Sequence, residues 1–129
     1  MKIYTSYFAV LRRIPEHIVP VSICLKVPDW FTGTQYKTLA PTSSILYQQK
    51  SNPDESRYIS RFNSEILGVL NREHVVKELE NLSDGKDVVL LCYEKPTSFC
   101  HRQLVAGWLS EYIGYPVNEW TSEDSNKNE

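Results

Sequence analysis

Five reactive or charged side chains lie close together in the second half of the chain, on the two sides of one short segment. Cys92 and Glu94 follow an apolar stretch, and Cys100, His101 and Arg102 come a few residues later. In the first turn of a helix, unpaired backbone N–H groups and the helix dipole stabilise a thiolate or a bound anion. This cluster therefore predicts a site for cysteine chemistry or for an anionic ligand.

We assign catalytic roles to three of these residues. Cys100 is the expected nucleophile or anion-site thiol, His101 the acid or base, and Glu94 the group that orients His101. Arg102 is the expected anion clamp, because a guanidinium binds phosphate and carboxylate with two parallel donors. Each role has a structural alternative: buried thiols are usually inert, His101 could donate to a backbone carbonyl that holds the loop, and Glu94 with Arg102 could form only a salt bridge.

Three further residues are assigned to ligand binding. Cys92 ends the apolar stretch, Ser6 lies in the end half of the first predicted strand, and Trp30 belongs to a loop that also holds Phe31 and Tyr36. Aromatic walls around one anion site suit a nucleotide-like ligand. The alternative is that the aromatic residues supply core volume and that Cys92 is a small core hydrophobe.

A metal site is the competing interpretation of the same cluster. Cys92, Glu94, Cys100 and His101 are a conceivable ligand set, with Cys24 as a remote fifth member. Their spacing differs from the paired, short-spaced motifs of structural zinc sites, and a helix N-terminus disfavours a cation. We therefore predict no metal and no cofactor. The phosphatase-type cysteine loop, the Gly-rich phosphate loop and the Gly-flanked serine nucleophile are also absent from the sequence.

The strands that must position this cluster follow from local composition. Aromatic and β-branched residues predict strands over 2–10 and 18–25, and the apolar run 87–93 predicts a central strand covered on both faces. A short last strand is expected over 115–120. The segment 26–44 contains three breakers and no usable period, which predicts a long surface loop.

Three helices are expected, each between an N-cap and a stop residue. The first runs from Asn52 to Leu70, the second from Asn71 to Gly85, and the third from Ser98 to Gly114 with its body at Phe99–Ile113. Strands that alternate with helices predict a single three-layer α/β sandwich with a small, mainly parallel sheet. Ligands of such sheets bind at the carboxyl ends of the strands, where the cluster falls.

Length and charge set the outer limits. A chain of 129 residues with 41% hydrophobic residues predicts one globular domain, which we place over 1–120. The polar tail 121–129, expected to be disordered, holds three acids and one base of the chain's 16 and 14, so the remainder has 13 of each. This balance argues against a global field that would attract duplex DNA or an anionic membrane.

Cysteine usage and the lack of long apolar segments predict a cytoplasmic protein with no membrane association. The N-terminus shows no signal-peptide pattern, and the run Val88–Tyr93 is far shorter than the roughly 20 residues of a membrane helix. The cysteines, an odd number that includes Cys24, are expected to be reduced. The oligomeric state is left open.

The two halves of the cluster resemble the domain-of-unknown-function family numbered 488, found in bacteria and their phages. That family pairs a Cys-x-Glu after a hydrophobic strand with a Cys-His-Arg at the next helix, and both are present here, beginning at Cys92 and Cys100. Over about 1–120 the chain looks like the longer form of the family, which it also matches at Thr5, Ser6, Tyr7, Phe8, Pro28, Trp30, Tyr36, Leu39, Ala40 and Pro41.

The resemblance implies a compact α/β fold and a role near nucleotide or nucleic-acid metabolism, but no particular reaction. Carried over, the motif names Cys92, Glu94, Cys100, His101 and Arg102, with Ser6 and Trp30 as weaker additions. Two functions remain open. One is a small enzyme acting on a nucleotide-like or other anionic ligand. The other is a non-catalytic module that binds nucleic acid or protein, in which the Cys-His-Arg motif is structural.

Overall fold

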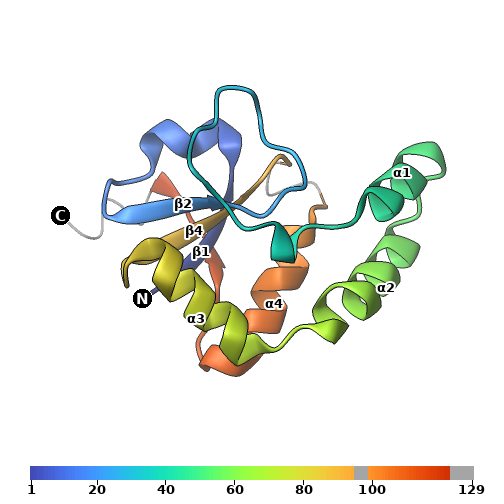
Figure 1. The fold of residues 1–129 in the computed structure, drawn as a ribbon. Coiled ribbons are helices and arrows are strands. Elements are labelled where there is room, and N and C mark those ends of the chain that lie inside the picture. The colour runs from blue at the N-terminus through green and yellow to red at the C-terminus, as the bar shows by residue number, and fades with distance from the viewer. Residues whose placement is uncertain (95–98, 123–129) are drawn as a thin grey trace.

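The computed structural model describes residues 1–94 and 99–122, which fold around one sheet (Figure 1). Its strands are β1 (Ile3–Tyr7), β2 (Ile18–Ser22), β3 (Thr34–Gln35), β4 (Asp87–Cys92) and β5 (Asn118–Glu119). Within the described residues the strand order is β3-β2-β4-β1-β5, and every pairing is parallel. The predicted parallel α/β architecture is confirmed.

Strand β4 is the centre of the sheet. Leu90 aligns with Thr5 of β1 on one side and with Val21 of β2 on the other. All residues of β4 from Val88 onward are buried. Burial on both faces explains why this run has no alternation between apolar and polar residues, as the sequence indicated.

Two clusters of buried side chains cover the two faces of the sheet. Val88 and Leu90 pack with residues of the α-helices, whereas Val89 and Leu91 pack with Phe8, Phe31 and Trp120 on the other face. Successive side chains of a strand point to opposite faces, so one strand feeds both clusters. The third layer of the sandwich is therefore a short 3₁₀ helix with a loop instead of α-helices.

The helices of the described chain are η1 (Phe8–Arg13), η2 (Lys37–Leu39), α1 (Ser43–Ser51), α2 (Glu55–Glu65), η3 (Leu67–Val69), α3 (Arg72–Ser83) and α4 (His101–Ile113). α3 begins as predicted, because the Asn71 side chain accepts a hydrogen bond of 2.9 Å from the His74 backbone N–H. It ends where Asp84 and Gly85 both take positive φ, of 54° and 77°. The left-handed conformation explains why glycine follows the helix there.

Helix α1 was missed, because no element was predicted over 45–51 and its first two residues were placed in the predicted loop 26–44. That predicted loop contains β3 and η2. α1 starts at the Thr42 cap, whose side chain accepts a hydrogen bond from the Ile45 N–H, and Ile45 is its only buried residue. A helix with so little apolar surface has no amphipathic pattern to detect.

The bounds of α2 also differ from the prediction. The N-cap is Asp54, whose carboxylate accepts a hydrogen bond of 3.1 Å from the Arg57 N–H, so Pro53 lies just outside the helix. α2 ends at Glu65, short of the predicted Leu70. Beyond it the chain tightens into η3, where a side chain on Gly68 would come within 2.9 Å of a backbone oxygen.

Three predicted strands are shorter than expected. β1 stops at Tyr7 because η1 begins at the next residue, β2 stops at Ser22, and the last strand contains only Asn118 and Glu119. The predicted cap Ser98 lies outside the described residues, and the N-cap of α4 is Cys100. Most of the predicted tail, 123–129, also lies outside them.

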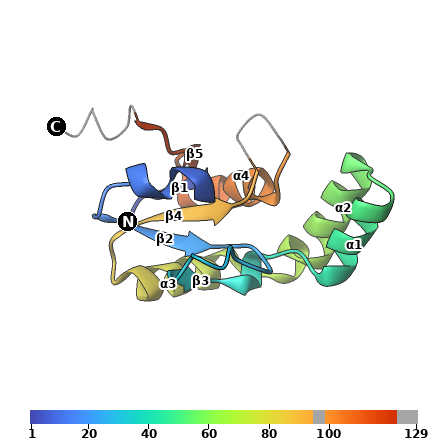
Figure 2. The same cartoon turned by 90° about the horizontal axis from the view of Figure 1, so that it is seen from above.

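Helices α1 and α2 stand beyond the carboxyl ends of β2 and β4, to one side of the sheet (Figures 1 and 2). They are joined by a short connection and pack against each other. This placement puts a helical wall opposite the sheet edge at which ligands of parallel sheets bind. None of the helices in the described part of the chain is long and apolar enough to cross a membrane.

Candidate functional site

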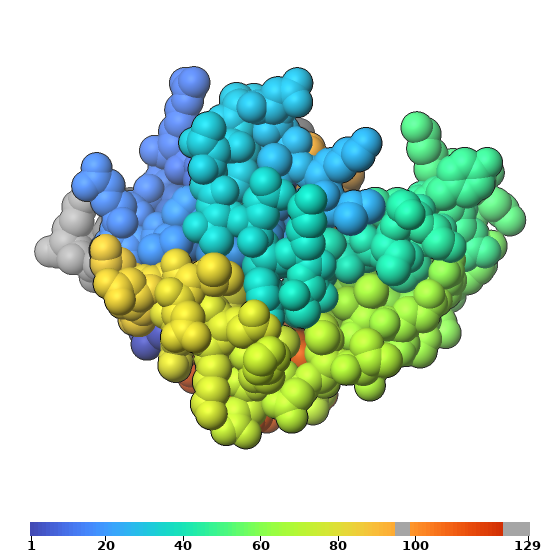
Figure 3. Space-filling view, in the orientation of Figure 1, coloured from blue at the N-terminus to red at the C-terminus, as the bar shows by residue number. Residues whose placement is uncertain are grey.

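A pocket of about 590 Å³ lies between the carboxyl edge of the sheet and the α1–α2 wall. Its lining combines the residues that follow β2, those that follow β4, one side of α1 and α2, and the start of α4. In the space-filling view, side chains of the blue-to-cyan loop that follows β2 extend toward green α1 (Figure 3). The volume is typical of a small-molecule site.

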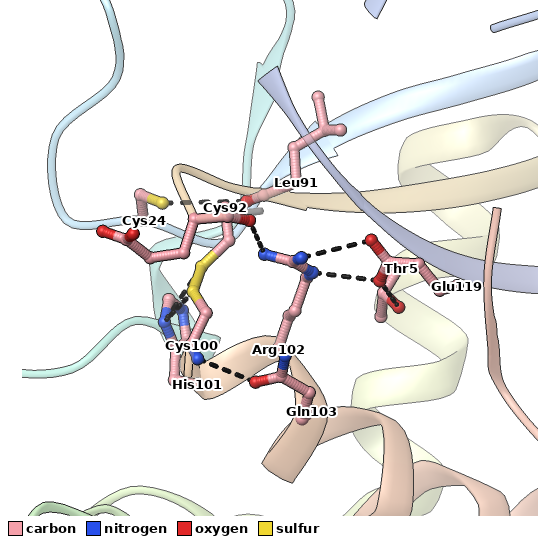
Figure 4. A network of polar contacts seen from close by, with 10 residues as sticks. Thr5, Cys24, Leu91, Cys92, Cys100, His101, Arg102, Gln103 and Glu119 are labelled. Atoms are coloured by element: carbon pink, nitrogen blue, oxygen red, sulfur yellow. Dashed lines mark hydrogen bonds and ion pairs between the residues drawn. A yellow bond between two sulfur atoms is a disulfide. The ribbon is translucent and has the colours of Figure 1, made fainter. Parts of the chain in front are cut away.

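Cys92 and Cys100 both line this pocket and form a disulfide. One is the last residue of β4 and the other is the N-cap of α4, and their Cα atoms are 7.0 Å apart. Figure 4 shows the two sulfur atoms joined beside the ring of His101. The expectation of reduced thiols is therefore corrected for this pair, and Cys24 is the one free cysteine of the chain.

His101 lies against both sulfur atoms. Its Nδ1 is 3.3 Å from Cys92 Sγ and 3.6 Å from Cys100 Sγ, and its Nε2 is 2.6 Å from the carbonyl oxygen of Ile23. A carbonyl can only accept a hydrogen bond, so the ring carries its proton on Nε2 and turns the Nδ1 lone pair toward the sulfurs. Burial lowers the pKa of His101 to about 4, which leaves the ring neutral at pH 7.

Arg102, the predicted anion clamp, is fully buried and is absent from the described lining of the pocket. Its Nε and Nη2 donate to the two carboxylate oxygens of Glu119 at 3.0 and 3.1 Å, and Nη1 donates to the Glu94 carbonyl oxygen at 2.5 Å. The Glu119 carboxylate also accepts from the Thr5 hydroxyl at 2.8 Å. These contacts use the guanidinium to fasten β5 and the end of β4 to α4.

Glu94 is exposed and lines the pocket. Among the described contacts, its carboxylate has none with His101. The Ile23 carbonyl oxygen orients the ring, so the role we expected of Glu94 is filled by the backbone after β2. Ser6 and Trp30 lie away from the described pocket.

Ser6 is buried in β1, and its hydroxyl has no hydrogen-bond partner among the described residues. Trp30 is 59% exposed and packs edge-on against Phe8 with ring centroids 6.2 Å apart. Phe8 belongs to the cluster on the η1 face of the sheet. Ser6 thus lies inside the sheet and Trp30 lies on the η1 face, and neither is among the described residues that line the pocket.

The pocket also contains residues outside the set that we assigned to catalysis and ligand binding, among them Cys24, which was considered only as a remote metal ligand. Cys24 and Lys26 follow β2, and the rule that ligands bind at carboxyl ends of strands would have pointed to them. Cys24 Sγ lies 3.7 Å from the Leu91 carbonyl oxygen, and burial raises its pKa to about 11. Tyr58 and Phe99 pack edge to face with ring centroids 5.2 Å apart and form an aromatic part of the lining.

The charges around the pocket are mixed. Lys26 is a cation at its lining, whereas Glu55 and Glu94 are acids. The remaining lining is mostly apolar or aromatic, from α1, α2 and the start of α4. The arrangement suits a small molecule that has an apolar or planar part and at least one polar end, with two sulfur atoms at its inner wall.

A family model described as "Active DUF488-N3 subclade" matches residues 8–113. The match spans both motif halves, from Cys92 to Arg102, and most of the elements that enclose the pocket. No curated protein and no solved structure matches the chain significantly. Because the matched segment covers most of its length, the chain belongs to the DUF488 family, within the DUF488-N3 subclade.

Proposed function

We propose that the chain is a thiol-dependent enzyme that carries out thiol–disulfide exchange with a small molecule bound in the pocket. The observation that carries this proposal is that both sulfur atoms of the Cys92–Cys100 pair line the pocket and contact a neutral imidazole. A pair of cysteines at a pocket can cycle between dithiol and disulfide without a further cofactor.

Cys100 is the attacking thiol in this proposal. It is the N-cap of α4, where the helix dipole favours a thiolate, and it is 7% exposed against 2% for Cys92. Its backbone N–H donates to Gln103 Oε1 at 2.7 Å, which holds the first turn in place. Cys92, at the end of the central strand, is the resolving thiol.

The reaction consists of two successive exchange steps. Cys100 Sγ attacks one sulfur of the substrate disulfide, that S–S bond breaks, and the first half leaves with the proton given up by Cys100. Cys92 Sγ then attacks Cys100 Sγ, which forms the Cys92–Cys100 disulfide and releases the second half with the Cys92 proton. One substrate disulfide becomes two thiols, and an external dithiol returns the chain to its reduced state. His101 Nδ1 accepts a hydrogen bond from whichever thiol keeps its proton.

The substrate class follows from the walls of the pocket. Tyr58 and Phe99 offer aromatic surface to a planar group, and Lys26 offers a cation to a carboxylate or phosphate. A small disulfide that carries a planar group and a carboxylate or phosphate, such as a nucleotide-like disulfide, fits this chemistry. We assign the anion contact to Lys26, because the donors of Arg102 are occupied by Glu119 and Glu94.

The reaction of the reduced protein with 5,5′-dithiobis(2-nitrobenzoate) tests the proposal. This probe is a small aromatic disulfide with two carboxylates, and its thiolate product is coloured. Wild type is expected to release both product thiolates rapidly, whereas Cys92→Ser stops after the first and keeps a mixed disulfide on Cys100. Cys100→Ser is expected to lose the fast phase, and Lys26→Ala to slow it severalfold.

Cys24→Ser is the matched control, because Cys24 lines the same pocket but is outside the reacting pair. It is expected to react at the wild-type rate. The proposal fails if Cys100→Ser keeps the fast phase or if Cys92→Ser still releases both thiolates rapidly. Binding of a nucleotide or nucleic acid by a protein that shows no fast exchange would instead support the non-catalytic binding module.

A further inference from the structure

The two cysteines and the histidine also form a candidate metal site once the disulfide is reduced. One ligand atom from each of Cys92, Cys100 and His101 lies within 4.8 Å of the others, and all three residues are buried. We propose that the dithiol form of the protein binds one Zn²⁺ through the two thiolates and His101 Nδ1. This proposal requires reduced thiols but does not rest on the exchange reaction proposed above.

The distances from His101 Nδ1 to the two sulfurs fit the metal already in the disulfide form, whereas the sulfurs must separate after reduction. With Zn–S bonds of about 2.3 Å and Zn–N bonds of about 2.0–2.1 Å, tetrahedral geometry places a sulfur and a nitrogen ligand about 3.5 Å apart. The two observed distances from His101 Nδ1, to Cys92 Sγ and to Cys100 Sγ, are 3.3 and 3.6 Å. The 7.0 Å between the cysteine Cα atoms leaves room for the sulfurs to separate to about 3.8 Å around a shared zinc ion.

The histidine is already held as a zinc ligand would be. Metal-binding histidines usually donate their second ring N–H to a carbonyl or carboxylate, which fixes the tautomer and the ring orientation. His101 Nε2 does so to the Ile23 carbonyl oxygen at 2.6 Å. The nitrogen that remains, Nδ1, faces the sulfurs, so the ring needs no rotation to bind the ion.

The charges of the ligands make zinc binding compatible with the positive N-terminal end of α4. The positive end of α4 disfavours a bare cation, but it favours the thiolate form of its N-cap, Cys100. Two thiolates neutralise Zn²⁺, so the assembled site carries no net charge. The nearest buried cation, Arg102, is paired with Glu119 and adds little repulsion.

The site would keep one open position. Three protein ligands with a fourth position for water or substrate are typical of catalytic zinc, whereas structural zinc sites are closed by four protein ligands. Cys92, Cys100 and His101 all line the pocket, which supplies the space for a fourth ligand. Zinc binding needs both sulfurs as thiolates, whereas in the Cys92–Cys100 disulfide both sulfurs are oxidised and bonded to each other. The two states therefore exclude each other.

Titration of the reduced, metal-free protein with Co²⁺ tests the inference, since thiolate ligands give cobalt a charge-transfer band and tetrahedral geometry gives intense visible bands. Reduced wild type is expected to bind one Co²⁺ per chain with both features and to release it to one equivalent of Zn²⁺. Cys92→Ser and Cys100→Ser are each expected to lose part of the charge-transfer intensity. Their affinity for Co²⁺ is expected to fall by over 100-fold, which exceeds the roughly 10- to 100-fold loss that follows a change in a residue that only supports a ligand.

Two controls separate loss of a ligand from loss of the fold. Cys24→Ser is expected to bind as wild type does, and oxidised wild type, which is the same chain with its disulfide closed, is expected to bind no Co²⁺ at this site. The inference is overturned if reduced and oxidised wild type bind Co²⁺ equally or if no thiolate band forms. Because the disulfide-exchange assay is run without metal, either proposal can fail while the other stands.

Discussion

At the scale of single residues, the contact between His101 and the Ile23 carbonyl oxygen decides the chemistry of the site. It places the ring proton on Nε2 and leaves the Nδ1 lone pair facing Cys92 and Cys100. Without this contact the ring could present an N–H to the sulfurs and could not bind a metal through Nδ1. A backbone carbonyl after β2 thus governs two side chains from β4 and α4.

Cys24 is predicted to be the least reactive thiol of the reduced chain. Burial raises its pKa to about 11, so at pH 8 almost none of it is in the thiolate form that reacts. Iodoacetamide at pH 8, followed by peptide mass spectrometry, is expected to label Cys100 first and Cys24 last. Labelling of Cys24 should increase only as the pH approaches 11. Faster labelling of Cys24 than of Cys100 at pH 8 would contradict its burial.

Arg102 is predicted to act on stability, in contrast to the anion clamp suggested by its motif. Arg102→Ala leaves the Glu119 carboxylate without its partner and removes a fully buried side chain. We expect a loss of roughly 3 kcal/mol in the free energy of unfolding, near the lower end for a broken buried pair because Glu119 remains partly exposed. Urea denaturation monitored by circular dichroism measures this loss.

The matched control is Lys77→Ala, which breaks the exposed Lys77–Glu73 pair of α3. Solvent screens that pair, so the denaturation midpoint is expected to move little. If Arg102→Ala left stability unchanged but weakened the binding of an anionic ligand at the pocket, the structural role proposed for Arg102 would be wrong. Its interpretation as an anion-binding residue would then be supported.

The sequence could predict that Cys92 and Cys100 lie close together and that His101 could donate to a backbone carbonyl, but not which carboxylate pairs with Arg102. When a buried strand is joined to a helix by a short segment, the end of the strand and the start of the helix lie close together at the sheet edge. The partner of Arg102 lies on β5, which aligns with β1 from the other end of the chain. No sequence spacing reports that pairing.

At the scale of elements, the α1–α2 pair forms the outer wall of the pocket, and α1 was the least predictable part of the fold. Leu46 and Gln49 line the pocket from α1, and Tyr58 lines it from α2. α2 has a clear apolar stripe that ends in Phe62, whereas α1 buries only Ile45. A mostly polar helix next to a loop has too little apolar surface to reveal its bounds.

Removal of the α2 cap is predicted to destabilise this wall. Asp54→Ala deletes the carboxylate that accepts from the Arg57 N–H at 3.1 Å. N-cap replacements by alanine cost about 1 kcal/mol, and asparagine should retain most of the stability because it caps equally well. Thermal unfolding of the two variants and the wild type tests this order. Equal stability of Asp54→Ala and wild type would mean that the cap contributes nothing here.

At the scale of the whole molecule, the parallel sheet could be predicted because each level of the sequence agrees with it. The uninterrupted apolar run from Val88 predicted a strand covered on both faces, and the caps around α3 predicted a helix next to it in sequence. The order of the strands was not predictable. It depends on which edges β3 and β5 join, and each contributes only two residues.

The disulfide is predicted to stabilise the whole fold. It links residues that are 8 apart in sequence, and closing a loop of that size reduces the entropy of the unfolded chain by an amount worth roughly 2–3 kcal/mol. Oxidised wild type should therefore unfold at higher urea than the reduced, metal-free form. Cys24→Ser should show the same difference between its two redox states. Identical midpoints for oxidised and reduced wild type would contradict the link.

The central claim is that Cys92 and Cys100 form one reversible redox pair at the pocket, and peptide mapping tests it most directly. The protein is equilibrated in buffers with graded ratios of dithiol to disulfide, its free thiols are blocked, and its peptides are identified by mass spectrometry. We predict one internal disulfide, between Cys92 and Cys100, that forms as the ratio of dithiol to disulfide falls and is reduced again as the ratio rises. Cys24 is expected to stay free at every ratio. A disulfide that involves Cys24, or none at any ratio, would contradict the account.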